Sequence, residues 1–136
     1  MLTDKLFVYG TLKKNFSNHD FLKDAEYLYD AYTLTKFQML DLEYYPALVK
    51  DDNGYCIKGE IYKINKKILD DIDILEGYPH FYTRELIPTT MSSFMVYVYY
   101  LKNNLKNYNN SYIKPIEGER YLEWRKKRDE SREFRF

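Results

Sequence analysis

The sequence predicts an α+β domain with one curved or closed sheet, and two observations lead to this prediction. Short runs rich in Tyr, Phe, Val and Ile recur along the chain and are separated by turn residues, as strands are. One internal stretch, residues 65–76, instead carries apolar residues at helical spacing. About six strands with one strong internal helix indicate the α+β class. The length of 136 residues suits a single domain over residues 1–136.

The first half of the chain is predicted to be mostly extended. Residues 5–9 form an apolar strand that runs into a loop at 10–17. Residues 18–25 are a weak helix candidate. Residues 27–40 are extended with a break, because Tyr, Thr, Phe and Leu dominate there. After a turn, residues 47–50 form a short strand.

The middle of the chain begins with a turn signal. The pair Asn53-Gly54 predicts a hairpin in which these residues supply the positive φ angles. Residues 55–64 form the next strand, and Gly59 inside it indicates a bulge or a close backbone approach. After the helix come strands at 81–88 and 94–101. The second of these is almost continuously apolar, so we expect it to be central and buried.

The C-terminal part is predicted to be polar and helical. Residues 103–112 are rich in Asn and predict a mobile loop. Residues 117–135 predict a charged helix, and residues 126–136 within and after it form a charged tail with no assigned role. The candidate anchors of this helix are Tyr121, Leu122 and Trp124.

Glu76 is the strongest candidate for a functional residue. The predicted helix has Asn65 as its N-cap and ends at Glu76, which lies on the apolar face formed by Ile68, Leu69, Ile72 and Leu75. Partial burial and the negative end of the helix dipole both raise the pKa of a carboxylate there, toward the range of a general base. The alternative is a glutamate that reaches water at a rim or pairs with an arginine.

A glycine turn near the N-terminus is the matching signal. The run Phe7-Val8-Tyr9-Gly10-Thr11-Leu12 is an apolar strand that enters a turn able to present bare backbone N–H groups. One segment thus offers a base and the other offers oxyanion donors. Strand packing by Tyr9 and an ordinary turn at Gly10-Thr11 are the alternatives.

Composition excludes several other classes of function. The formal net charge is zero, which argues against nucleic acid as a partner. No apolar run is long enough for a membrane span, and the N-terminus has no signal-peptide layout, so we expect a cytoplasmic protein. One cysteine, Cys56, and two histidines, His19 and His80, do not make a usual zinc set, and we expect no metal.

Four short motifs occur in one order along the chain. They are Val8-Tyr9-Gly10-Thr11-Leu12, Tyr45-Pro46-Ala47-Leu48, Ile57 to Tyr62, and Leu69 to Tyr78 followed by Phe81-Tyr82-Thr83-Arg84. In this respect residues 5–125 resemble the γ-glutamylcyclotransferase-like family, which includes γ-glutamylamine cyclotransferases and AIG2-like proteins. The resemblance implies a small mixed β-barrel flanked by helices, with a pocket at one end.

The resemblance also implies roles for particular residues. It makes Glu76 the catalytic acid/base and residues Tyr9, Gly10, Thr11 and Leu12 the substrate-binding loop, with Tyr82 near the pocket. Tyr45, Pro46, Tyr78 and Arg84 are further candidates for the pocket lining. From residue type alone, Tyr82 is equally well a core tyrosine, and Arg84 more often pairs with an acid.

The implied reaction is an intramolecular aminolysis. The α-amine of a γ-glutamyl amine or γ-glutamyl amino acid attacks its own γ-amide and releases 5-oxoproline and a free amine. Glu76 would carry the proton between the two nitrogens, and no cofactor or covalent intermediate is required. The competing hypotheses are another small amide substrate and a non-enzymatic binding module. The leaving group is open, and we expect a monomer or a weak dimer with a small-molecule ligand.

Overall fold

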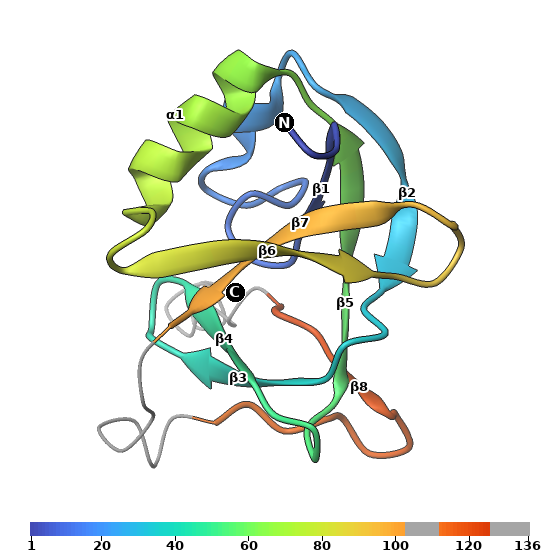
Figure 1. Ribbon diagram of the computed structural model, residues 1–136. Coiled ribbons are helices and arrows are strands. Elements are labelled where there is room, and N and C mark those ends of the chain that lie inside the picture. The colour runs from blue at the N-terminus through green and yellow to red at the C-terminus, as the bar shows by residue number, and fades with distance from the viewer. Residues whose placement is uncertain (103–111, 126–136) are drawn as a thin grey trace, which may run out of the picture.

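The computed structural model describes residues 1–102 and 112–125 (Figure 1). Its elements are β1 (Lys5–Val8), the short 3-10 helix η1 (His19–Leu22), β2 (Glu26–Tyr32), β3 (Phe37–Asp41), β4 (Pro46–Lys50), β5 (Cys56–Lys63), α1 (Lys66–Glu76), β6 (Tyr82–Pro88), β7 (Met95–Leu101) and β8 (Tyr121–Leu122). This mixture of strands with few helices confirms the predicted α+β class. The weak helix candidate at residues 18–25 shortens to η1.

The main sheet is mixed and strongly curled. Its strand order is β2-β5-β1-β7-β6, and β8 adds to β5. β1 is antiparallel to β5 but parallel to β7. The two edges meet only at one bridge, between Thr33 after β2 and Thr89 after β6. Of the curved or closed sheet that the sequence predicts, the structure has the curved form, and the implied barrel is not closed: sheet twist brings the edges together at one end without a continuous ladder.

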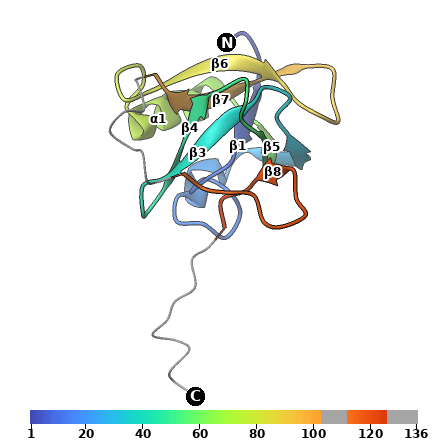
Figure 2. The same ribbon diagram turned by 90° about the horizontal axis from the view of Figure 1, so that it is seen from below.

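A two-stranded ribbon, β3–β4, forms the second sheet. In Figure 2 this ribbon runs across the curled sheet with β4 beside β7, and its buried Phe37, Met39 and Leu48 join a core cluster of the main sheet. The predicted Asn53-Gly54 hairpin is wrong in two respects. β4 and β5 belong to different sheets, and neither turn residue has a positive φ.

Gly54 has a different reason to be glycine. A Cβ on Gly54 would lie 2.4 Å from the carbonyl oxygen of Phe37. The next residue, Tyr55, exchanges backbone hydrogen bonds with Phe37 at 2.8 and 2.9 Å. Glycine at position 54 therefore permits a close approach of two backbones. After the chain leaves β4, Tyr55 can pair with Phe37 at the start of β3.

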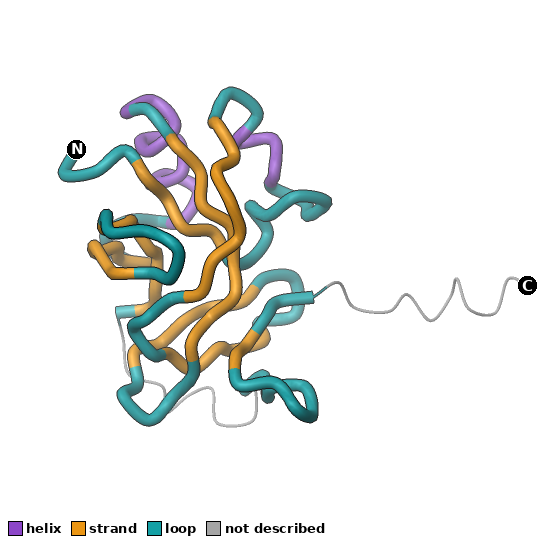
Figure 3. Tube along the Cα trace, turned by 90° about the vertical axis from the view of Figure 1, so that its right-hand side faces the viewer, coloured by secondary structure: helices purple, strands orange, loops and turns teal. Residues whose placement is uncertain are grey.

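The helix α1 begins and ends as its sequence predicts. The side chain of Asn65 accepts a hydrogen bond from the N–H of Ile68 at 2.9 Å, and Gly77 ends the helix with φ of 66°. Ile68, Leu69 and Ile72 are buried, whereas Leu75 is 37% exposed. Figure 3 shows both helices at the same end of the sheet. None of the helices in the described part of the chain is long and apolar enough to cross a membrane.

The predicted C-terminal helix is wrong over the residues that the structure describes. Tyr121–Leu122 form β8, which runs parallel to β5 and pairs with Cys56 and Ile57. Leu122 and Trp124 are buried and alternate with less buried neighbours, which is the period of a strand. Of the predicted mobile loop at 103–112, residues 103–111 lie outside the described residues, as does the charged tail at 126–136, whereas Tyr112 forms a bridge with Leu40.

Gly59 shows the close approach that its position in a strand predicts. A Cβ there would lie 2.4 Å from the carbonyl oxygen of Val8 and 2.5 Å from the Phe7 ring. We expect Gly59→Ala to lower the free energy of unfolding by about 2 kcal/mol, because the backbone of β1 must move. Denaturant unfolding measures this, with exposed Lys63→Ala on the same strand as the control. Equal stability of both variants would contradict the prediction.

Candidate active site

A cavity of about 350 Å³ opens where β1 ends. It is lined by the end of β1 and the following turn, by the loop before η1, by the start of β4, by the end of α1 and by parts of β6 and β7. The lining residues are Phe7, Val8, Tyr9, Gly10, Thr11, Leu12, Ser17, Asn18, Tyr44, Tyr45, Pro46, Leu75, Glu76, Phe81, Tyr82 and Tyr99.

The cavity brings together most of the candidate residues named from the sequence. Glu76, the four residues of the glycine turn, Tyr82 and the pair Tyr45-Pro46 all line it, although they come from distant parts of the chain. Tyr78 and Arg84 do not line it. The sequence analysis missed Asn18 before η1, Phe81 before β6, and Tyr99 on β7. Asn18 reaches the cavity through its bonds to Thr11, and Phe81 and Tyr99 reach it through the curl of the sheet.

Glu76 is the acidic residue of the cavity. It is the last residue of α1, and the left-handed Gly77 turns the chain away directly after it. Burial raises the pKa of the Glu76 carboxyl from 4.5 to about 7. A group with this pKa exists in both protonation states near neutral pH, as a general acid/base requires.

The glycine turn lines the cavity and leaves two of its own N–H groups without a partner inside the turn. The N–H of Lys13 donates to the carbonyl of Gly10 at 3.1 Å and closes the turn. The N–H groups of the two central residues, Thr11 and Leu12, have no partner inside such a turn. Asn18 fixes the turn from outside: its N–H donates to the Thr11 carbonyl at 2.8 Å, and its Nδ2 donates to Thr11 Oγ1 at 2.9 Å.

Gly10 is required by packing as well as by access. A Cβ on Gly10 would lie 2.7 Å from Cγ of Pro46, the residue that begins β4. Real Cβ atoms do not come this close, so a side chain would push the turn and the Pro46 ring apart. The glycine turn and the start of β4 therefore fix each other's position in the cavity wall.

Two buried tyrosines complete the wall. Tyr9 donates its hydroxyl hydrogen bond to the Tyr99 carbonyl at 2.7 Å, and Tyr82 donates to the Pro46 carbonyl at 2.9 Å. Burial raises the pKa of Tyr9 well above its usual value, and the neighbouring Tyr82 and Glu76 raise it further. These bonds fix the direction of both hydroxyls, and Tyr9 lines the same cavity as Glu76.

Arg84 pairs with an acid, the alternative that its residue type favours. Its Nε and Nη2 donate to the two oxygens of Asp73 at 2.8 and 3.1 Å. The guanidinium lies 4.3 Å from the centre of the Tyr78 ring and 4.8 Å from that of Tyr97. Asp73 also accepts from the Tyr99 hydroxyl, so it is shared by two donors. This pairing raises the pKa of Arg84 still further.

The cavity has an unusual charge balance. Of the described residues that line it, none is Lys, Arg or His, and Glu76 is the only carboxylate. Within residues 1–102 and 112–125, no three His, Cys, Asp or Glu side chains gather as metal ligands. The arrangement can accept a proton at Glu76 and donate hydrogen bonds from the turn.

Comparison with known proteins agrees with this fold. The family model described as "Gamma-glutamyl cyclotransferase, AIG2-like" matches residues 6–125. The Escherichia coli K12 protein YtfP, named a gamma-glutamylcyclotransferase family protein, is 34% identical over 95 residues, which cover 70% of this chain and 81% of YtfP.

Two solved structures share the fold. An AIG2-like protein from mouse superposes with a TM-score of 0.72 at 24% sequence identity, over 79% of this chain and 83% of that one. An uncharacterised protein from Pyrococcus horikoshii superposes with a TM-score of 0.67 at 24% identity, over 82% and 86% of the two chains.

The fold and the cavity define a small α+β protein whose pocket, walled by a partly buried carboxylate and a glycine turn, suits a small molecule. The family match covers nearly all of the described chain. This protein belongs to the gamma-glutamyl cyclotransferase, AIG2-like family.

The raised pKa of Glu76 predicts a pH-dependent stability. Since the folded protein holds this proton more tightly than an exposed glutamate, the resulting stabilisation is complete below about pH 4.5 and is lost as the pH rises through 7. The loss amounts to about 3 kcal/mol. Gln mimics the protonated form, so Glu76→Gln should be more stable than the wild type at pH 8 and equal to it near pH 4.5. Urea unfolding at both pH values measures this, and parallel pH profiles of the two proteins would contradict it.

Proposed function

We propose that this protein is a γ-glutamyl cyclotransferase that converts a γ-glutamyl amine or a γ-glutamyl amino acid into 5-oxoproline and a free amine. One observation carries the proposal: Glu76, with a pKa raised to about 7, lines the same cavity as the turn that presents the Thr11 and Leu12 N–H groups. The family match supports the same class of reaction.

The first step needs a base. The substrate's α-ammonium must lose a proton before its nitrogen can attack, and the Glu76 carboxylate takes that proton. The α-nitrogen then forms a bond to the γ-carbonyl carbon, which gives a five-membered ring and a tetrahedral oxyanion. The N–H groups of Thr11 and Leu12 stabilise this oxyanion. The sequence alone suggested donors at Gly10-Thr11, but Thr11 and Leu12 are the two central residues of the turn.

The second step needs an acid. The protonated Glu76 delivers its proton to the leaving nitrogen, the bond between that nitrogen and the γ-carbonyl carbon breaks, and the carbonyl re-forms. The regenerated Glu76 carboxylate takes the second proton of the ring nitrogen and passes it to the released amine, which leaves as an ammonium ion. One carboxyl group serves both steps because ring closure attaches both nitrogens to the same carbon. No net proton is consumed within the site. Folding the flexible glutamyl chain into the cavity contributes the rest of the catalysis through positioning.

We expect purified protein to release 5-oxoproline from at least one member of a panel of γ-glutamyl amines and γ-glutamyl amino acids. Glu76→Gln should lower kcat by at least about 10²-fold, the scale of a lost general base. Asp70→Asn on the exposed side of α1 is the matched control and should keep full activity. In the wild type, kcat/KM should rise with pH through about 7, as Glu76 ionises.

Three results would change this proposal. Near-normal activity of a folded Glu76→Gln protein would remove Glu76 from the mechanism. Turnover of another amide without 5-oxoproline would assign the same pocket to a different substrate. Tight binding of a γ-glutamyl compound without any turnover would indicate a binding protein.

The contact between Gly10 and Pro46 gives a second test. Gly10→Ala should lower kcat by about 10²-fold, because the Pro46 ring displaces the turn and its donors. Adding Pro46→Ala removes the ring while keeping the carbonyl that Tyr82 uses, so the double variant should recover part of the activity. Full activity of a folded Gly10→Ala protein would contradict the role of the turn.

A further inference from the structure

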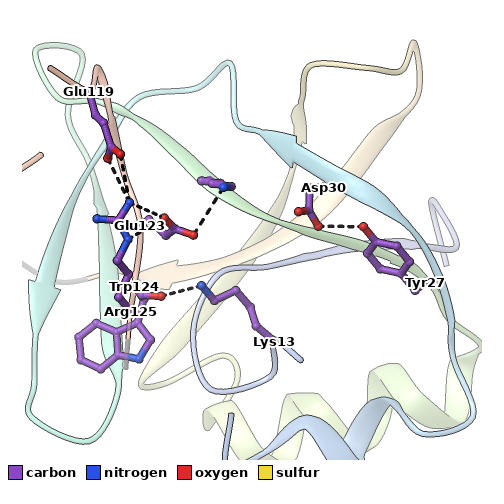
Figure 4. Close-up of polar contacts among 8 residues, drawn as sticks. Lys13, Tyr27, Asp30, Glu119, Glu123, Trp124 and Arg125 are labelled. Carbon is purple, nitrogen blue, oxygen red and sulfur yellow. Dashed lines mark hydrogen bonds and ion pairs between the residues drawn. The ribbon is translucent and has the colours of Figure 1, made fainter. Parts of the chain in front are cut away.

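Lys13 is a buried lysine that directly follows the two donor residues of the turn. Lys13 as a whole is only 5% exposed. Its Nζ donates to the carbonyl oxygen of Trp124 at 2.6 Å and lies 4.8 Å from the centre of the Phe16 ring. Figure 4 shows this side chain reaching from its loop to the C-terminal segment, 111 residues away in the sequence. A buried ammonium held on one carbonyl is a specific and costly contact.

The acceptor of this contact is itself held in place. β8 pairs with β5 up to Leu122, two residues before Trp124. Arg125, directly after Trp124, binds Glu119 at 3.2 Å and Glu123 at 2.7 Å (Figure 4). The alternation of Leu122 and Trp124 into the core fixes the direction of the strand. The Trp124 carbonyl therefore has a defined position relative to the main sheet.

Residue 13 fixes the turn through both its backbone and its side chain. Its N–H closes the turn onto the Gly10 carbonyl at 3.1 Å, while its Nζ binds the C-terminal segment. The next N–H, that of Lys14, donates to Glu60 Oε1 on β5 at 3.0 Å. The loop is thus held by β5 on one side and by the segment after β8 on the other.

We propose that Lys13 is a positioning residue, and that its bond to the Trp124 carbonyl makes residues 119–125, here called the C-terminal brace, a structural part of the substrate-binding turn. The brace fixes where the Thr11 and Leu12 N–H groups point. The catalytic reading of this proposal rests on the proposed cyclotransferase function; the mechanical coupling between the turn and the brace does not.

The kinetic test compares two lysines of the same charged cluster. Lys13→Met keeps the stem but removes the donor, whereas Lys58→Met removes a lysine that lies 3.7 Å from Glu123 and does not hold the loop. With 5-oxoproline release as the assay, Lys13→Met should lower kcat by about 10²-fold, since a donor misplaced by about 1 Å costs that much. KM should change by less than about threefold, as for an interaction made in the transition state. The pKa of Glu76, followed by NMR, should stay near 7. Lys58→Met should match the wild type.

The pattern of these three quantities separates positioning from general stability. Loss of the fold would move KM and the pKa of Glu76 together with kcat. A folded Lys13→Met protein with wild-type kcat would overturn the proposal and leave the cyclotransferase function standing. The same result with Lys58→Met as with Lys13→Met would assign the effect to cluster charge and would also overturn it.

Hydrogen exchange tests the coupling without any substrate. The amides of residue 13 and Asn18, whose hydrogen bonds to the Gly10 and Thr11 carbonyls hold the turn, should exchange about tenfold faster in Lys13→Met, with the amides of β6 and β7 unchanged. Arg125→Leu disturbs the brace from the other side and should accelerate the same two amides, which keeps the test decisive if Lys13→Met does not fold. Unchanged exchange of the amides of residue 13 and Asn18 in Arg125→Leu would refute the coupling. If the wild type releases no 5-oxoproline, only the proposed function fails, and these exchange rates still decide about the brace.

Discussion

The ion pair between Arg84 and Asp73 is the interaction on which the chemistry of the cavity depends. Arg84 carries a positive charge that could neutralise a carboxylate near the end of α1. Its guanidinium instead donates hydrogen bonds to both oxygens of Asp73. Asp73 precedes Glu76 by one turn of α1, so Asp73 rather than Glu76 neutralises the positive charge of Arg84. Burial then acts on Glu76 without an opposing attraction, and its pKa rises to about 7.

The curl of the sheet brings this carboxylate opposite the turn. β1 lies between β5 and β7, so its end is fixed on both sides, and the chain must leave the sheet at Tyr9. Tyr9 and Tyr99 join the end of β1 to β7 through one hydrogen bond, and Tyr99 reaches on to Asp73. A continuous set of polar contacts thus runs from the turn through β7 to the helix that carries Glu76.

Local signals were enough to predict much of this structure. Asn65, Gly77 and the apolar spacing between them define α1, and the position of Glu76 follows from that spacing. The errors arose where contacts between distant segments of the chain determine the local structure. Asn53-Gly54 has the local pattern of a hairpin, yet contact with Phe37 sets its conformation. The charged C-terminal segment becomes a strand because β5 extends past its pairing with β1, which leaves Cys56 and Ile57 free to pair with β8 on that side. The cavity residues Asn18, Phe81 and Tyr99 had no local signal.

On the proposed reaction, the charge balance of the cavity itself favours the first step. A γ-glutamyl substrate would bring an ammonium beside the Glu76 carboxylate, in a cavity that no described Lys, Arg or His lines. Transfer of one proton converts this pair of ions into an amine and a carboxylic acid, both neutral. Since burial disfavours charged forms, desolvation favours the neutral pair more than water does. The same burial that raises the pKa of Glu76 would therefore lower the pKa of the bound amine, and the attacking nitrogen becomes available without a metal or a second base.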